Sequence, residues 1–301
     1  MAPTRSRSSL RTRRTSRSLT TSLSSKDPQD FGEKGALRRP FFYAERRGDE
    51  LMRLSIPLEQ INGFFFGFKR GRYFPTRRFP PLTSEEQAIT DRFHRLYYRR
   101  LFSKATAPSE VSWLGHRVLK CPMDMITYQE IITETQPDLI IECGTKFGGS
   151  AFFLATICQL VGNGRIVTID INAPDDPPKH NLITYLTGSS TDAAIVEQVK
   201  NMIRPDMRVM VILDSDHRAA HVRRELELYA PLVSSGCYLI VEDGNVNGHP
   251  VFPEHGPGPQ EAIKDFLATD DRFELDTQRE RHLLTLNPGG FLRRKGEAAS
   301  A

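Results

Sequence analysis

Two apolar runs of the sequence each end in acidic residues. The run VMVIL is followed by Asp214, and the later run YLIV is followed by Glu242 and Asp243. Continuous apolar runs of this length are typical of strands buried on both faces of a sheet, and neighbouring parallel strands end at the same edge. All three side chains offer hard oxygen ligands, the type that Mg²⁺ prefers. The pattern therefore predicts a magnesium site made by Asp214, Glu242 and Asp243.

Crowding is the physical argument for a cation at this place. Three carboxylates packed closely raise one another's pKa unless a positive charge sits among them. The alternative is that the acids cap helices or pair with arginines. His217 follows Asp214 closely; a lone histidine is most often structural, but its pKa near neutrality suits proton transfer beside a metal. Asp216 either orients that imidazole or caps the following helix.

An earlier apolar run continues into a glycine-rich turn, LIIECGTKFGGS. Its glycines follow the spacing GxxxGG, whereas a dinucleotide-binding turn has GxGxxG, and Glu142 in the turn would repel a polyphosphate. S-adenosylmethionine fits better because its sulfonium and amine are cationic. We expect Glu142 to supply negative potential near the methionine part of this ligand. The turn through Gly144, Thr145 and Ser150 is expected to let the ligand lie against the main chain.

Two further positions complete the predicted cofactor site. Asp170 ends the run RIVTID, where an acid in nucleotide-binding sheets accepts hydrogen bonds from both ribose hydroxyls. Ser189, with Gly188, follows the next run, LITYLT, and is expected to border the adenine. For Asp170 alone, a solvated acid at a strand end is an equal alternative, and the glycine turn before it favours the ligand.

The elements that would position these residues alternate from about residue 110 onward. Seven apolar runs predict strands, at 138–144, 165–171, 182–188, 208–214, 237–243, 272–277 and 282–286. Five stretches with helical spacing predict helices, at 124–135, 150–161, 191–203, 218–233 and 259–269. Strands that alternate with helices imply right-handed crossovers and a parallel sheet covered on both faces. The predicted fold is α/β, a doubly wound, mostly parallel, seven-stranded sheet of the Rossmann-like kind with an N-terminal arm.

An ordered set of motifs resembles a known family. LIIECGTKFGGS, VTIDI, GSS, VILDSDH, LIVEDGNVNGHP and GPGPQEAIKDFL are, in this order, similar to the cephalosporin hydroxylase and rhamnosyl O-methyltransferase family, over roughly residues 113–293. Each motif alone is weak, and their order carries the resemblance. It implies a class I methyltransferase fold, S-adenosylmethionine and a divalent metal as cofactors, a metal-binding role for the same three acids, and His217 as general base.

The head of the chain differs in composition from the rest. Residues 1–26 carry six arginines and one lysine but no acid, which is typical of a disordered tail or of an organellar transit peptide. The predicted domains are 1–30 for this tail, 31–109 for an aromatic and basic arm with a helix capped by Thr83 or Ser84, 110–295 for the methyltransferase domain, and 296–301 for a second tail. Unless the head directs import, we expect a cytoplasmic protein.

The arm alternates aromatic and basic residues in INGFFFGFKRGRYFPTRRFPP. Such a stretch is either a platform for nucleic acid or an arm that packs against its own domain or a neighbouring subunit. The second interpretation is favoured because no nucleic-acid motif accompanies it. Residues from 105 onward also carry 27 acidic against 18 basic side chains, a poor surface for a phosphate backbone. We therefore expect a homo-oligomer without a nucleic-acid partner; no apolar run is long enough to span a membrane.

These observations predict an S-adenosylmethionine- and Mg²⁺-dependent O-methyltransferase. Its acceptor would be a hydroxyl with an adjacent oxygen on a sugar, glycolipid or natural product. Residues 244–258 would form a substrate lid in which His249 and His255 are candidate contacts, although solvent exposure is favoured for both. Two other classes stay open. One is a hydroxylase-type accessory enzyme of natural-product biosynthesis, which the lack of a two-histidine, one-carboxylate spacing disfavours; the other is a non-catalytic binding protein on a methyltransferase fold.

Overall fold

The computed structural model describes residues 68–69, 72–73, 78–102 and 111–296. The chain divides into two units, Met1–Ser55 and Ile56–Ala301, and all of the described residues belong to the second. The predicted N-terminal tail, nearly all of the predicted C-terminal tail and the larger part of the predicted arm lie outside the described residues. Their assignments therefore stay predictions.

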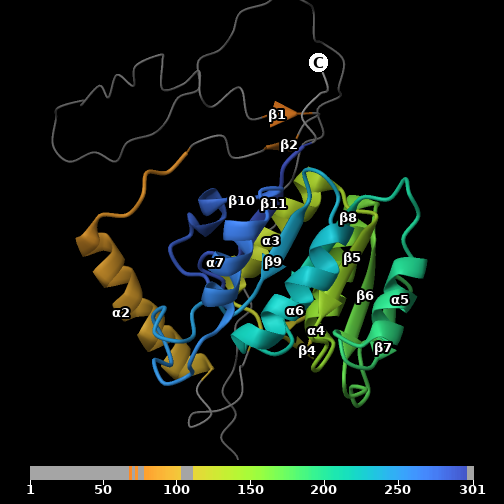
Figure 1. The fold of residues 1–301 in the computed structure, drawn as a ribbon, viewed down its shortest axis with the longest axis horizontal. Coiled ribbons are helices and arrows are strands. Elements are labelled where there is room, and N and C mark those ends of the chain that lie inside the picture. Colours follow the sequence, from red (N-terminus) through yellow and green to blue (C-terminus); the bar gives the residue numbers. More distant parts are fainter. Residues whose placement is uncertain (1–67, 70–71, 74–77, 103–110, 297–301) are drawn as a thin grey trace, which may run out of the picture. The chain divides into compact units, whose positions relative to one another are not determined.

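A seven-stranded sheet forms the centre of the described domain, in the order β10-β11-β9-β8-β5-β6-β7 (Figure 1). The strands are β5 (Leu139–Cys143), β6 (Arg165–Asp170), β7 (Ile183–Thr187), β8 (Val209–Leu213), β9 (Tyr238–Val241), β10 (Phe273–Leu275) and β11 (Phe291–Arg294). Strands β5 to β9 are parallel to one another, whereas β11 runs antiparallel between β9 and β10. The predicted α/β fold with a mostly parallel seven-stranded sheet is confirmed.

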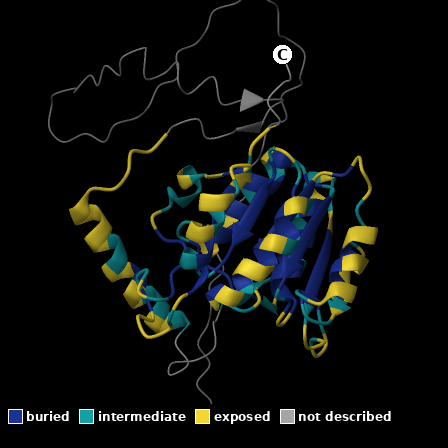
Figure 2. Ribbon diagram, in the orientation of Figure 1, coloured by how far each residue is buried: buried dark blue, intermediate teal, exposed yellow. Residues whose placement is uncertain are grey.

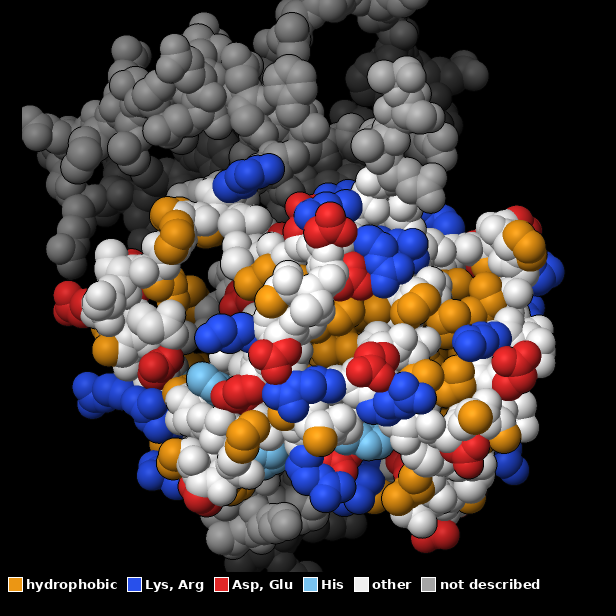
Figure 3. Space-filling view, viewed as in Figure 1, with side chains coloured by type: hydrophobic (Ala, Val, Ile, Leu, Met, Phe, Trp, Pro, Cys, Tyr) orange, Lys and Arg blue, Asp and Glu red, His pale blue; other side chains and the backbone are white. Residues whose placement is uncertain are grey.

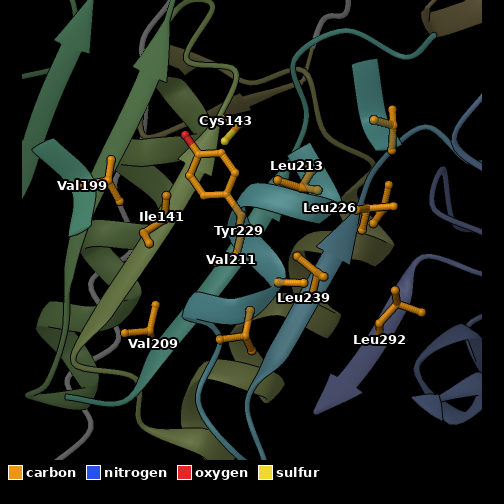
Figure 4. Close-up of a cluster of buried hydrophobic side chains, with 14 of the residues drawn as sticks. Ile141, Cys143, Val199, Val209, Val211, Leu213, Leu226, Tyr229, Leu239 and Leu292 are labelled. Atoms are coloured by element: carbon orange, nitrogen blue, oxygen red, sulfur yellow. The ribbon is translucent and has the colours of Figure 1, made fainter. Parts of the chain in front are cut away.

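Helices cover both faces of this sheet. They are α3 (Pro122–Thr135), α4 (Gly149–Val161), α5 (Ala193–Asn201), α6 (Ala219–Tyr229) and α7 (Pro259–Thr269), with short 3₁₀ helices η1 (Ala230–Leu232) and η2 (Thr277–Glu280). Side chains of β5 alternate between the faces: Ile141 belongs to the apolar cluster that also contains Val199 of α5 and Leu226 of α6 (Figure 4), whereas Ile140 belongs to a second cluster with Leu154 of α4. Burial on both faces explains the continuous apolar runs in the sequence. Figure 2 shows the buried strands between helices whose outer surfaces are exposed.

One predicted strand is wrong. The run 282–286 is irregular, and the last strand, β11, comes after it. Leu283 has a φ of +67°, and the Leu286 N–H donates to the carboxylate of Asp124 (2.9 Å) while its carbonyl accepts from the N–H of Asn245 (3.2 Å). These bonds use the backbone groups that a β ladder would need. The run has the apolar pattern of a strand because Leu284 and Leu286 pack in a small separate cluster.

A helix and two short strand pairs precede this sheet. They are α2 (Ser84–Leu101), β1 (Phe68–Lys69) with β2 (Arg72–Tyr73), and β3 (Ser112–Trp113) with β4 (His116–Arg117). The helix cap is Thr83, whose hydroxyl accepts from the Glu86 N–H (3.3 Å) while the Glu86 carboxylate accepts from the Thr83 N–H (2.8 Å). The buried residue of α2 is His94, and near the C-terminal end the Tyr98 ring lies edge-on to Phe252 with centroids 5.4 Å apart.

The surface carries mixed charge. On the face seen in Figure 3, lysine and arginine side chains alternate with aspartate and glutamate. Interspersed charges of this kind give a weak long-range field. Among the described helices, none is long and apolar enough to cross a membrane.

Candidate active site

The acids predicted to bind a metal follow neighbouring strands at the same level. β8 and β9 are parallel, and their last residues are partners in the ladder. Asp214 and Glu242 come directly after these partners, so both lie at the carboxyl edge of the sheet. Asp243 comes next, with a φ of +52° that turns the chain away from the strand direction. The structure thus brings the three acids to the one edge where the sequence places them.

Asp214, His217 and Asp243 form a group suited to a metal ion. Each offers one ligand atom, and these atoms lie within 4.8 Å of one another. All three residues are half-buried, so the group can be reached from solvent. His217 Nε2 lies 3.0 Å from Asp243 Oδ2. Carboxylate oxygens with one imidazole nitrogen fit Mg²⁺ or a similar divalent cation, so the donor set passes this chemical test.

Glu242 lies in different surroundings from the other two acids. Its Oε1 accepts from Lys120 Nζ (2.5 Å) and from the Tyr128 hydroxyl (2.8 Å), and the same ammonium donates to Oδ2 of Asp214. Lys120 is 2% exposed, so the acidic cluster contains a buried positive charge of its own. Crowding of the acids alone therefore does not demand a metal ion, contrary to the expectation from the sequence.

Three residues of this network were not predicted from the sequence. Lys120 precedes α3, Tyr128 lies on α3, and Asn287 follows the irregular run near the C-terminus. The Asn287 side chain donates to the Tyr128 hydroxyl (2.9 Å), and its oxygen accepts from the N–H of Asp243 (3.1 Å). Single residues of these types carry no spacing signal. The one signal for Lys120 is the general need of buried acids for a counter-charge.

Burial and pairing shift the pKa values of this cluster. Burial would lower the pKa of Lys120, but attraction to Asp214 and Glu242 outweighs it and raises that pKa. Burial raises the pKa of Asp214 and raises that of Glu242 well above its ordinary value. Burial also acts on Asp243, but the neighbouring His217 keeps its pKa lowered. For His217, pairing with Asp243 outweighs burial and raises the pKa to about 9. At neutral pH the two side chains therefore form an ion pair.

Glu142 is fully buried near the end of β5. Its Oε2 accepts from the Thr168 hydroxyl (2.6 Å), whose oxygen lies 2.7 Å from Thr145 Oγ1. Its Oε1 is buried without a hydrogen-bond partner of ordinary geometry in the described part of the chain. Burial raises the pKa of Glu142, opposed by Lys120 and by the hydroxyls of Ser150 and Thr168. A buried acceptor without a donor is a place where an ammonium group of a ligand can bind.

Gly144 has a packing role that the sequence did not reveal. Its φ is +107°, and a Cβ at this position would lie 1.9 Å from the carbonyl oxygen of Asp214. The missing side chain therefore lets the ends of β5 and β8 approach each other. Whether the turn also contacts a ligand stays a prediction.

Asp170 is the last residue of β6 and Ser189 follows β7, at the same edge of the sheet. The two oxygens of Asp170 accept from the backbone N–H groups of Lys146 (2.9 Å) and Asn172 (3.0 Å). The carboxylate thus fixes the local turns, and each oxygen retains a second lone pair for a ribose hydroxyl. The Ser189 hydroxyl lies 3.0 Å from that of Thr191. Their contacts with a nucleoside stay predictions.

The other candidates bind neighbouring side chains or face solvent. Asp216 accepts from the backbone N–H and the guanidinium of Arg218, the residue before α6, whereas the His217 ring pairs with Asp243. His249 belongs to the 244–258 segment, and its Nε2 lies 3.1 Å from Oε1 of Glu261 on α7. His255, in the same segment, is exposed. The 244–258 segment contains neither helix nor strand, as predicted.

The sheet order, the reversed strand β11 and the acids at the carboxyl edge define a class I methyltransferase fold. The chain belongs to the Rhamnosyl O-methyltransferase/CmcI family, whose model matches residues 106–295. The resemblance seen in the sequence is therefore confirmed.

Relatives and solved structures agree with this assignment. The chain is 39% identical over 215 residues to the rhamnosyl O-methyltransferase of Mycobacterium bovis (strain BCG / Pasteur 1173P2), covering 68% of this chain and 84% of that protein. It is 37% identical over 214 residues to the Mycobacterium leprae protein of the same name, covering 69% and 91%. An apo structure of CmcI matches with a TM-score of 0.51 at 21% identity, covering 82% and 98%, and a structure of CmcI with Mg and SAM matches with 0.50 at 20% identity, covering 81% and 98%. These structural matches show the fold.

Proposed function

We propose that this protein is an S-adenosylmethionine- and divalent-cation-dependent O-methyltransferase that methylates a sugar hydroxyl. One observation carries the proposal: the carboxylates of Asp214 and Asp243 lie beside the His217 imidazole, with one side-chain N or O atom of each within 4.8 Å of the others, at the carboxyl edge where the buried Glu142 also lies. The names of the mycobacterial relatives support a rhamnosyl acceptor, and the Mg and SAM of the CmcI structure support the cofactors.

Asp214, Glu242 and Asp243 are the residues that we propose to hold the cation. Lys120 and Tyr128 both donate to Oε1 of Glu242, and this leaves Oε2 as the oxygen that we propose for the cation. When bound, Mg²⁺ would supply Lewis-acid chemistry that lowers the pKa of an acceptor hydroxyl with an adjacent oxygen. The role of these side chains is to fix where the acceptor oxygen lies.

His217 is the proposed general base. Its pairing with Asp243 keeps it protonated at neutral pH, and an imidazolium cannot accept a proton. When another positive charge pairs with the Asp243 carboxylate, the pKa of His217 falls toward neutrality and its Nε2 can accept a proton. The protonation state of His217 thus depends on the partner of Asp243. His217 can accept a proton only when Asp243 is paired with another positive charge.

The cofactor half of the site follows the order of the strands. Glu142 would bind the ammonium of the methionine part, Asp170 the ribose hydroxyls, and Ser189 would border the adenine. S-adenosylmethionine, when bound there, supplies a methyl group on a positively charged sulfur. The chain's contribution is to hold the acceptor oxygen in line with that methyl group, which lowers the entropic part of the barrier.

Calorimetry with S-adenosylmethionine, with and without Mg²⁺, followed by mass spectrometry of rhamnose-containing acceptors, tests this function. The proposal predicts saturable cofactor binding and a Mg²⁺-dependent mass gain of one CH₂ group. Transfer that proceeds equally well in excess chelator would contradict the metal requirement.

Association into a homo-oligomer is a further expectation, supported by the exposed apolar residues Ile89, Phe93 and Leu96 on α2.

A further inference from the structure

Lys120 occupies the middle of the acidic cluster. It belongs to the irregular segment between β4 and α3, is 2% exposed, and donates to Asp214 Oδ2 and to Glu242 Oε1. A lysine this deeply buried is tolerated because its charge is paired. The same contacts also hold one oxygen of each acid, which fixes the direction of the other oxygen.

A cation that binds at these acids therefore arrives beside a positive charge that is already present. Two opposing effects follow. Lys120 orients Asp214 and Glu242, which favours binding, and it repels a divalent cation, which opposes binding. The repulsion involves a double charge in a largely buried, weakly screened place, whereas the orientation amounts to one hydrogen bond at each acid. The electrostatic effect should be the larger of the two.

We propose that Lys120 is a positioning residue that presets the carboxylates of Asp214 and Glu242 and limits the affinity of the site for divalent cations. The metal-free protein then keeps the acids in place without a metal, and the cation stays exchangeable. This inference rests on the proposed function because it assumes that a cation binds at these acids.

The direct test compares Lys120→Met with Tyr128→Phe. Methionine keeps a long unbranched side chain and removes the charge. The Tyr128→Phe variant removes a donor to the same oxygen of Glu242 and leaves all charges unchanged, so it is the matched control. Both are measured by Mg²⁺ titration calorimetry without S-adenosylmethionine, and by thermal unfolding in chelator and in Mg²⁺.

The expected results differ between the two variants. Both should unfold at a lower temperature than the wild type in chelator. The Lys120→Met variant should bind Mg²⁺ about tenfold tighter or more and gain a larger thermal shift from it, because the cation replaces the missing charge. Tyr128→Phe should show no such tightening. Lys120→Arg, which retains the charge, should not bind Mg²⁺ tighter than the wild type.

An affinity of Lys120→Met that is unchanged or weaker than that of the wild type would overturn the inference while leaving the proposed function intact. If Lys120→Met does not fold in chelator, the inference requires that Mg²⁺ restore folding, and failure in both conditions also overturns it. A wild-type protein that binds no Mg²⁺ would overturn the metal part of the proposed function and this inference with it.

Discussion

His217 Nε2 lies 3.0 Å from Oδ2 of Asp243, so the candidate base and a candidate metal ligand are each other's partner. The pairing raises the pKa of His217 to about 9 and lowers that of Asp243. A proton on the imidazole and a cation at the carboxylate are therefore competing ways to neutralise the same acid. This competition connects metal binding to the protonation state that proton abstraction needs.

The stability of the metal-free protein should fall at alkaline pH because of this pair. The pKa of His217 is near 6.5 in the unfolded chain and about 9 in the folded one, so the folded state binds the proton more tightly. The stabilisation is complete below about pH 6.5 and is lost as the pH rises through 9. With allowance for solvent screening it amounts to about 1–2 kcal/mol. Thermal unfolding in chelator from pH 6 to 10 should show a steeper decline for the wild type than for His217→Gln; parallel curves would contradict the pairing.

Acid should destabilise the protein through His94. Burial lowers its pKa to about 4, and the Asn245 side-chain amide lies 3.0 Å from its Nε2, where a neutral ring accepts a hydrogen bond. Between about pH 6.5 and 4 the unfolded chain takes up a proton that the folded chain does not, so stability falls by up to about 3 kcal/mol. His94→Gln, which cannot titrate, should lose less stability over this interval. Circular dichroism melts at pH 7 and pH 4.5 measure the difference, and equal losses would argue against a buried neutral histidine.

Gly144 should tolerate no side chain. An alanine there would place its Cβ 1.9 Å from the carbonyl oxygen of Asp214, in addition to the strain of a φ of +107°. Gly162→Ala is the matched control, because its φ is +83° and no heavy atom lies within 4 Å of the Cβ position. Urea unfolding should show that Gly144→Ala loses about 2 kcal/mol or more beyond the loss in the control. Comparable losses would mean that β5 and β8 can separate without cost.

Glu142 should determine cofactor affinity. Glu142→Gln keeps the shape of the side chain and removes the negative charge proposed to bind the cofactor ammonium. The affinity for S-adenosylmethionine should fall about tenfold or more, as expected for loss of a charge-assisted hydrogen bond in a buried place. The control is Glu197→Gln on the exposed side of α5, which should leave the affinity unchanged. Equal affinities of Glu142→Gln and the wild type in calorimetry would remove this residue from the cofactor site.

The sequence was sufficient to predict the central parallel strands of the sheet because they are buried on both faces. Buried parallel strands are short, apolar and separated by helices, so β5, β6, β8 and β9 stand out, and the acids after β8 and β9 necessarily share an edge. The run 282–286 has the sequence pattern of a strand because Leu284 and Leu286 pack in a side cluster, which needs the same apolar residues. Only the backbone partners of Leu286 separate the two cases.

The internal charge partners could not be predicted in the same way. Lys120 reaches Asp214 and Glu242 across 94 and 122 residues of sequence, and nothing local to it distinguishes it from a solvated lysine. The sequence indicates that Gly144 is needed for the approach of a ligand to the turn. In the structure, the group that needs the missing side chain is the backbone carbonyl of Asp214. Such contacts depend on how the ends of separate strands meet, which periodicity does not encode.

Titration of the metal-free protein with Mg²⁺, for the wild type and for Asp214→Asn, tests the central claim most directly. The structure predicts one saturable site per chain in the wild type and an affinity at least about tenfold weaker in the variant, because a carboxylate ligand is lost. Equal heats from the two proteins, or no binding by the wild type, would contradict a cation site at the ends of β8 and β9.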